Sequence, residues 1–175
     1  VEPKIDGVIL SLRYEAGRLV RALTRGNGVM GDDVTHNVRT MRGLPLRLRD
    51  EAPPAVLEVR GEGFMSRSAF QALNAQRLAA NQPLFANARN TTAGTLKLLD
   101  SREAALRPMD AIFYARGEML GWSPASQADL VAGLRQRGLR TCELTWLCES
   151  LEAVLAALTE LQTRKGELPF EIDGA

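Results

Sequence analysis

An alternating pattern near the start of the chain constrains its fold more than any other feature. Every second residue from position 8 to position 14 is large and apolar (Val, Leu, Leu, Tyr), and side chains two residues apart share one face of a strand. Residues 15–17 (Glu-Ala-Gly) form a turn, and residues 19–24 run back. The pattern predicts a β-hairpin, whose strands are necessarily antiparallel.

Strands and helices are interspersed along the rest of the chain. We expect further strands over residues 55–64, 111–115, 139–147 and 168–173. A short helix is expected within residues 32–42, and a longer one from the N-cap Ser66 to Gln82. Residues 87–90 (Asn87–Asn90) are expected to form a polar loop, followed by a short helix that reaches about Leu99. Two further helices are expected, from Ser126 to Gly138 and from Leu151 to Gly166. This order, together with the hairpin, predicts an α+β fold built on an antiparallel sheet.

Length and charge bound the class of protein. The 175 residues suffice for one domain, and a net charge of +1 is unlike that of a dedicated nucleic-acid module. No apolar run approaches the roughly 18 residues of a membrane span. Cys142 and Cys148 lack a second ligand pair for zinc, so we interpret them as ordinary thiols. The chain does not begin with Met, and we expect residues 1–175 to be one domain cut from a longer protein.

Three short charged segments are candidate sites. Glu2, Lys4 and Asp6 alternate in an extended segment before Gly7, so they are expected to point into the same space. Residues 58–62 place three charged side chains on one strand face, with a glycine at position 61 that permits close backbone approach. Asp173 precedes a glycine at another strand end. Each pattern alone fits a solvated strand surface better than a reactive site.

Taken together, in order and spacing, these segments resemble the covalent nucleotidyltransferases, a superfamily of DNA ligases, RNA ligases and mRNA capping enzymes. The connecting sequences narrow the resemblance to NAD-dependent DNA ligases. Residues 24–40 (TRGNGVMGDDVTHNVRT) are similar to the long signature that follows the lysine motif, residues 85–90 with 93–94 to an Asn/Arg loop, and residues 107–114 to the strand that meets the base. The resemblance covers essentially the whole chain.

This resemblance implies a three-step reaction. The lysine amine attacks the α-phosphorus of NAD and releases nicotinamide mononucleotide, the AMP passes to the 5′-phosphate of a DNA nick, and the 3′-hydroxyl seals the strand. It implies that Lys4 is the nucleophile and that Asp6 orients the site. Glu62 and Asp173 match the carboxylates that hold the waters of Mg²⁺ (or Mn²⁺) or the ribose.

The resemblance also implies binding residues. Glu2 matches the position that reads the adenine edge, Tyr114 the ring that stacks on the base, and Arg25 a nucleotide-contacting arginine. Arg89 and Lys97 match positions that approach the nick phosphates, although surface charges without a role are an alternative for both.

The chain departs from the family pattern at Asn27 (usually Asp), Ala88 (usually Pro), Thr91-Thr92 (usually small residues), Lys97 (usually Arg) and Ala115 (usually Gly). They are interpreted as drift, because the lysine and carboxylate motifs all match. The implied partners are NAD, nicked double-stranded DNA and the remaining domains of the same polypeptide, with no membrane. We expect a monomer in the bacterial cytoplasm near the nucleoid, and no full reaction from this fragment alone.

Two other functions stay open at this point. An ATP-dependent nucleic-acid ligase or capping-type nucleotidyltransferase shares the short motifs but not the connecting sequences. A catalytically dead DNA-binding module would be expected to have lost one of Lys4, Asp6, Glu62 or Asp173, and all four are present.

Overall fold

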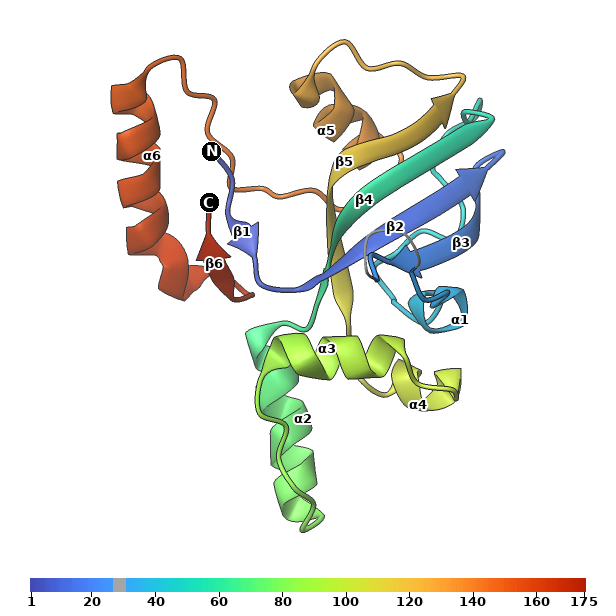
Figure 1. The fold of residues 1–175 in the computed structure, drawn as a ribbon, viewed down its shortest axis with the longest axis vertical. Coiled ribbons are helices and arrows are strands. Elements are labelled where there is room, and N and C mark those ends of the chain that lie inside the picture. Colours follow the sequence, from blue (N-terminus) through green and yellow to red (C-terminus); the bar gives the residue numbers. More distant parts are fainter. Residues whose placement is uncertain (27–30) are drawn as a thin grey trace.

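The computed structural model describes residues 1–26 and 31–175, and its strands pair as two antiparallel sheets. The larger sheet has the strand order β3 (Arg18–Thr24), β2 (Val8–Glu15), β4 (Val56–Phe64), β5 (Asp110–Leu120). The smaller sheet pairs β1 (Lys4–Ile5) with β6 (Ile172–Gly174), from opposite ends of the chain (Figure 1). The predicted hairpin is β2–β3, and the expected mixture of helices with antiparallel strands is confirmed.

Six α-helices flank these sheets in the described part of the chain: α1 (Thr35–Val38), α2 (Arg67–Ala79), α3 (Ala88–Leu96), α4 (Ser101–Ala105), α5 (Gln127–Gln136) and α6 (Leu151–Arg164), the last followed by the 3₁₀ turn η1 (Lys165–Glu167). Ser66, Ser126 and Ser150 begin their helices by accepting a hydrogen bond from the amide three residues on. Figure 1 shows α2 projecting away from the sheets and α6 standing beside β1 and β6. Among the described residues, no helix has both the length and the apolar content needed to cross a membrane.

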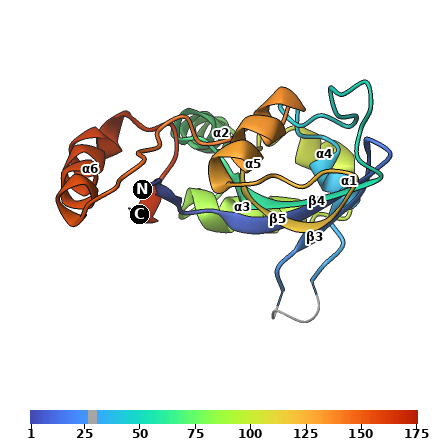
Figure 2. The same cartoon turned by 90° about the horizontal axis from the view of Figure 1, so that it is seen from above.

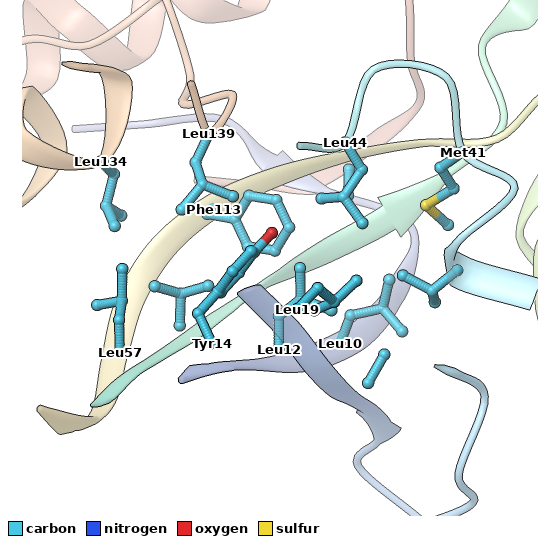
Figure 3. Close-up of a cluster of buried hydrophobic side chains, with 14 of the residues drawn as sticks. Leu10, Leu12, Tyr14, Leu19, Met41, Leu44, Leu57, Phe113, Leu134 and Leu139 are labelled. Carbon is cyan, nitrogen blue, oxygen red and sulfur yellow. The ribbon is translucent and has the colours of Figure 1, made fainter. Parts of the chain in front are cut away.

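The main core lies on one face of the four-stranded sheet, the face covered by α5 (Figures 2 and 3). Leu10, Leu12 and Tyr14 of β2 are fully buried there, as the alternation predicts, and Leu134 of α5 packs in the same cluster. The Tyr14 hydroxyl donates to the Pro45 carbonyl at 2.9 Å, so its burial leaves no unpaired hydroxyl. Each fully buried leucine contributes about 1.5–3 kcal/mol, so this face anchors the sheet.

A second apolar cluster joins the two sheets. Phe64 at the end of β4 meets Phe170, just before β6, edge to face with ring centroids 5.2 Å apart. Ile5, Leu161 and Ile172 complete this contact from β1, α6 and β6. The two-stranded sheet is therefore held against the ends of β4 and β5, and a seam runs between the sheets.

Several predicted boundaries were wrong. Residues 139–147 form no strand, because their backbone bonds go to two separate places: the Arg140 carbonyl accepts from Phe113, and Trp146 exchanges bonds with Val1. The polar loop expected at Asn87–Asn90 is the first turn of α3, since the Asn87 side chain accepts from the Asn90 amide and acts as an N-cap.

Other elements differ in extent. The strand expected over residues 111–115 continues to Leu120, and the last strand is shorter than expected, beginning at Ile172. The helix expected within residues 32–42 is the single turn α1, and α4 was not predicted.

Gly61 makes the close backbone approach that the sequence suggests. A Cβ atom there would lie 2.2 Å from the Ile112 carbonyl oxygen and 2.8 Å from Phe113 Cδ1. We expect Gly61→Ala to lower the free energy of unfolding by about 1–3 kcal/mol, because the backbone of β5 must move. Urea denaturation measures this. Gly94→Ala in α3 is the control, since a Cβ there meets nothing within 4 Å, and it should raise stability by about 0.4–1 kcal/mol. Equal effects would contradict the prediction.

Candidate active site at the seam between the sheets

A cavity of about 430 Å³ opens along the seam, lined by Pro3, Lys4, Ile5, Ile9, Arg25, Glu62, Arg89, Ile112, Tyr114, Cys142 and Asp173. Its polar groups come from both sheets and from α3. The lysine and one carboxylate lie on the two-stranded sheet, whereas the other carboxylate and the tyrosine lie on β4 and β5. The structure thus brings together most of the site residues that the sequence predicts.

Lys4 and Asp173 face each other across the small sheet. The register pairs Lys4 with Gly174, and the Lys4 Nζ lies 2.5 Å from the Asp173 Oδ1. The hydrogen bond from Lys4 holds the pKa of the Asp173 carboxyl below its usual range. Both side chains remain well exposed, so the amine is accessible from the cavity.

Glu62 is the buried carboxylate of the site. Burial raises its pKa above the ordinary glutamate value, although the Tyr114 hydroxyl donates to its Oε2 at 3.3 Å and the positive charges of Arg89 and Lys4 act in the opposite direction. Gly7 makes room for this side chain, since a Cβ at position 7 would lie 2.7 Å from Glu62 Cγ. The glycine of the lysine motif therefore permits close contact with β4.

Arg89 and Asp6 form an ion pair at one end of the cavity, with the Arg89 Nη1 2.7 Å from the Asp6 Oδ1. Arg89 lies in the first turn of α3 and lines the cavity, so Asp6 contacts the site through it. Arg25 follows the end of β3 and also lines the cavity, close enough to Tyr114 for its charge to oppose the rise in the tyrosine pKa that burial causes.

Two predicted residues lie elsewhere. Glu2 does not share a space with Lys4; it lines a separate cavity of about 600 Å³ beside α5. The reason is that Val1 pairs with Trp146, whereas strand pairing with β6 starts only at Lys4. Cys142 lines both cavities, so they adjoin. Lys97 at the C-cap of α3 is ion-paired with Asp32 at 2.8 Å, outside the cavity lining.

Apolar residues of the site were missed from the sequence. Ile9 and Ile112 line the cavity next to Glu62 and Tyr114. A signal existed for Ile112, because it lies two residues before Tyr114 in a strand and so shares its face. Cys142 had no such signal, since its segment forms no strand.

Of the positions that depart from the family pattern, Ala88 lies in α3 and Ala115 in β5, whereas Asn27 falls outside the described residues.

The acidic groups of the site fit a hydrated magnesium ion. No group of three or more His, Cys, Asp or Glu side chains among the described residues could hold a metal ion directly. Mg²⁺ takes oxygen ligands and keeps several of its waters, commonly with only one or two protein carboxylates. The Glu62 and Asp173 carboxylates, both in the wall of one cavity, are such a set.

Comparisons with known proteins agree on one family. The family model for the NAD-dependent DNA ligase adenylation domain matches residues 1–175. A DNA ligase of Geobacter metallireducens is 47% identical over 173 residues, which is 99% of this chain and 26% of that protein. A DNA ligase of Methylacidiphilum infernorum is 45% identical over 175 residues, which is 100% of this chain and 25% of that protein. The chain spans about a quarter of the length of these curated relatives.

Proposed function

The chain belongs to the NAD-dependent DNA ligase adenylation domain family, and on this premise we propose that it takes AMP from NAD onto Lys4. The observation that carries the proposal is the position of the Lys4 amine. Among the described residues it is the one lysine in the cavity wall, and it shares that wall with Glu62, Tyr114 and Asp173. We assign the fold to the covalent nucleotidyltransferases, which its antiparallel sheets support, and the nucleotide to the cavity between the two sheets.

In the proposed first step the Lys4 Nζ, as a neutral amine, attacks the α-phosphorus of NAD. The Lys4 ammonium first gives one proton to solvent and becomes this neutral amine. A phosphorus–nitrogen bond then forms as the phosphorus–oxygen bond to nicotinamide mononucleotide breaks, and the nitrogen gives one further proton to solvent and keeps one N–H. Asp173 holds the Nζ through the 2.5 Å contact and so orients it toward the cavity. Mg²⁺ or Mn²⁺, held through its waters by Glu62 and Asp173, would supply positive charge beside the α-phosphate.

The adenosine half of NAD is assigned to the larger sheet. The Tyr114 ring, half-buried on β5, offers a face on which adenine stacks, and its hydroxyl is held by Glu62. We assign Arg25, which lines the cavity, to the nucleotide as well. Glu2 reads the adenine edge where the two cavities adjoin, on the side of Cys142.

The later steps involve nicked DNA. We assign Arg89 and Lys97, on one helix, to the phosphates beside the nick. In the structure both are ion-paired, with Asp6 and Asp32, so DNA binding exchanges each carboxylate for a phosphate. Arginine binds phosphate as a fork and lysine as a point charge, which makes Arg89 the more geometrically selective contact. The remaining domains of a longer polypeptide, acting as a monomer in the cytoplasm, complete the reaction.

The donor nucleotide distinguishes this function from an ATP-dependent ligase. We expect the full-length protein to become labelled from adenylate-labelled NAD and Mg²⁺, with release of nicotinamide mononucleotide, and to show no labelling above background from ATP. Electrophoresis of the labelled protein measures both. Labelling from ATP alone would assign the chain to the ATP-dependent class, and labelling from neither donor would indicate a binding module without catalysis.

A further inference from the structure

Arg67 lies at the joint between the two sheets. It is the first residue of α2, three positions after β4 ends at Phe64. Its guanidinium is ion-paired with the Glu171 carboxylate, with Nε 3.0 Å from Oε1. The Nη2 donates a hydrogen bond to Oε2 at 3.2 Å, whereas Nε makes no hydrogen bond. A charge-assisted hydrogen bond of this kind holds the guanidinium against the carboxylate.

The same arginine also holds the connection between α6 and β6. Its Nη1 donates to the Gly166 carbonyl at 3.4 Å and its Nη2 to the Lys165 carbonyl at 3.3 Å. Its main-chain amide donates to the Pro169 carbonyl at 2.8 Å. One residue three positions beyond β4 therefore contacts the chain at several points just before β6 begins.

Glu171 passes this contact on to the reactive pair. Its main-chain carbonyl accepts from the Asp6 amide at 2.8 Å, beside β1, and it stands two residues before Asp173. The path from β4 through Arg67 and Glu171 thus reaches both strands of the small sheet. Glu62 lies at one end of this path, and the Lys4–Asp173 pair lies at the other.

We propose that Arg67 is a positioning residue that sets the distance between Glu62 on one sheet and the Lys4–Asp173 pair on the other. The inference rests on the proposed function of Lys4. A partly exposed ion pair contributes little to stability, and Arg67 and Glu171 are 31% and 52% exposed. The reaction rate is more sensitive than stability to small displacements, because a misplacement of about 1 Å can slow a reaction by about 100-fold.

The distribution of contacts gives this role a kinetic signature. Of the residues assigned to bind the nucleotide, Tyr114 lies on the larger sheet and Arg25 directly follows it. Glu2 is held beside Val1, which pairs with Trp146 and not with Arg67. The amine that attacks lies on the smaller sheet. Loosening the joint moves the amine away from the bound nucleotide without removing nucleotide contacts. The rate constant at saturating NAD should therefore fall, whereas KM for NAD should stay nearly unchanged.

The test uses the full-length protein with the variants Arg67→Ala and Arg67→Lys. We expect Arg67→Ala to slow single-turnover adenylation at saturating NAD by about 10- to 100-fold. Arg67→Lys should recover only part of the rate, because one ammonium cannot reproduce the spaced contacts of the guanidinium to Glu171 and to the Lys165 and Gly166 carbonyls. The control is Arg102→Ala, which removes an exposed arginine–carboxylate ion pair with Asp100 at the start of α4, outside the cavity lining. It should leave the rate unchanged.

Two further measurements separate positioning from simple loss of structure. Amide hydrogen exchange at Asp6 should accelerate in Arg67→Ala, while the urea midpoint stays close to that of Arg102→Ala. The charge exchange Arg67→Glu with Glu171→Arg should restore part of the rate, because it re-forms the ion pair but not the hydrogen bonds to the Lys165 and Gly166 carbonyls. The proposal is overturned if Arg67→Ala adenylates at the wild-type rate. It is also overturned if Arg67→Ala loses adenylation rate only in proportion to a lowered urea midpoint, with no faster amide exchange at Asp6. If wild-type protein is not labelled at all, the proposed function fails instead, and Asp6 exchange still decides whether Arg67 holds the joint.

Discussion

Full-length protein carrying Lys4→Ala should gain no AMP when it is incubated with NAD and Mg²⁺. The chain has three lysines, and their surroundings differ. Lys4 lines the cavity and is held by Asp173, Lys97 is paired with Asp32 outside the cavity lining, and Lys165 lies in the η1 turn. Among the residues that the structure describes, no other side chain in the cavity wall offers an amine, so the adduct should be lost completely.

Intact-protein mass spectrometry measures this loss, and peptide mapping of wild-type protein identifies the modified residue. Lys165→Ala is the matched control, since it removes a lysine that does not line the cavity and should leave the adduct unchanged. An AMP group on Lys97 or Lys165, or an undiminished adduct in Lys4→Ala, would show that Lys4 is not the nucleophile.

The second largest effect is expected at the two carboxylates. Glu62→Gln and Asp173→Asn each keep the shape of the side chain but remove a negative charge from the cavity wall. Each should slow adenylation by about 10²–10³, the usual effect of losing one electrostatic contact in an active site. For Asp173→Asn the oriented contact with Lys4 also weakens, because it is an ion pair with an Nζ–Oδ1 distance of 2.5 Å.

Single-turnover labelling at saturating NAD and Mg²⁺ measures these rates, with circular dichroism to check folding. Glu58→Gln is the control: Glu58 lies on the same face of β4 but accepts from the Ser11 hydroxyl at 2.9 Å, outside the cavity lining. A near-normal rate in either test variant would remove that carboxylate from the proposed role. If Glu58→Gln lost as much adenylation rate as Glu62→Gln, negative charge anywhere on β4, and not a carboxylate in the cavity wall, would support the reaction.

Local patterns predicted the larger sheet well. The alternation in β2 places Leu10, Leu12 and Tyr14 in the core because one face of that sheet is covered, and the Ser126 N-cap begins α5 as expected. The roles of the site residues came from the family resemblance. Their assembly could not be derived from local pattern, because the seam depends on pairing between the two ends of the chain.

Errors arose where long-range contacts decide the backbone. Glu2 was expected beside Lys4 because a regular strand alternates, but Val1 pairs with Trp146 and directs Glu2 into the neighbouring cavity. The leucines of α6 show a limit of a different kind. Their spacing predicts a helix correctly, yet Leu151 and Leu155 are exposed, because periodicity defines a face without defining what covers it.

The pairing of β1 with β6 has a consequence for the order of assembly during synthesis. Lys4 and Asp173 are separated by 169 residues, whereas the main core draws on residues between positions 10 and 139. Contacts of such long sequence separation close the largest loop and form late, since the loss of chain entropy precedes the gain. A nascent chain on the ribosome can therefore fold its larger sheet while the Lys4 amine still lacks its partner. Formation of the Lys4–Asp173 pair is coupled to synthesis of β6, so a translation product interrupted before β6 would carry a folded larger sheet without the partner of Lys4.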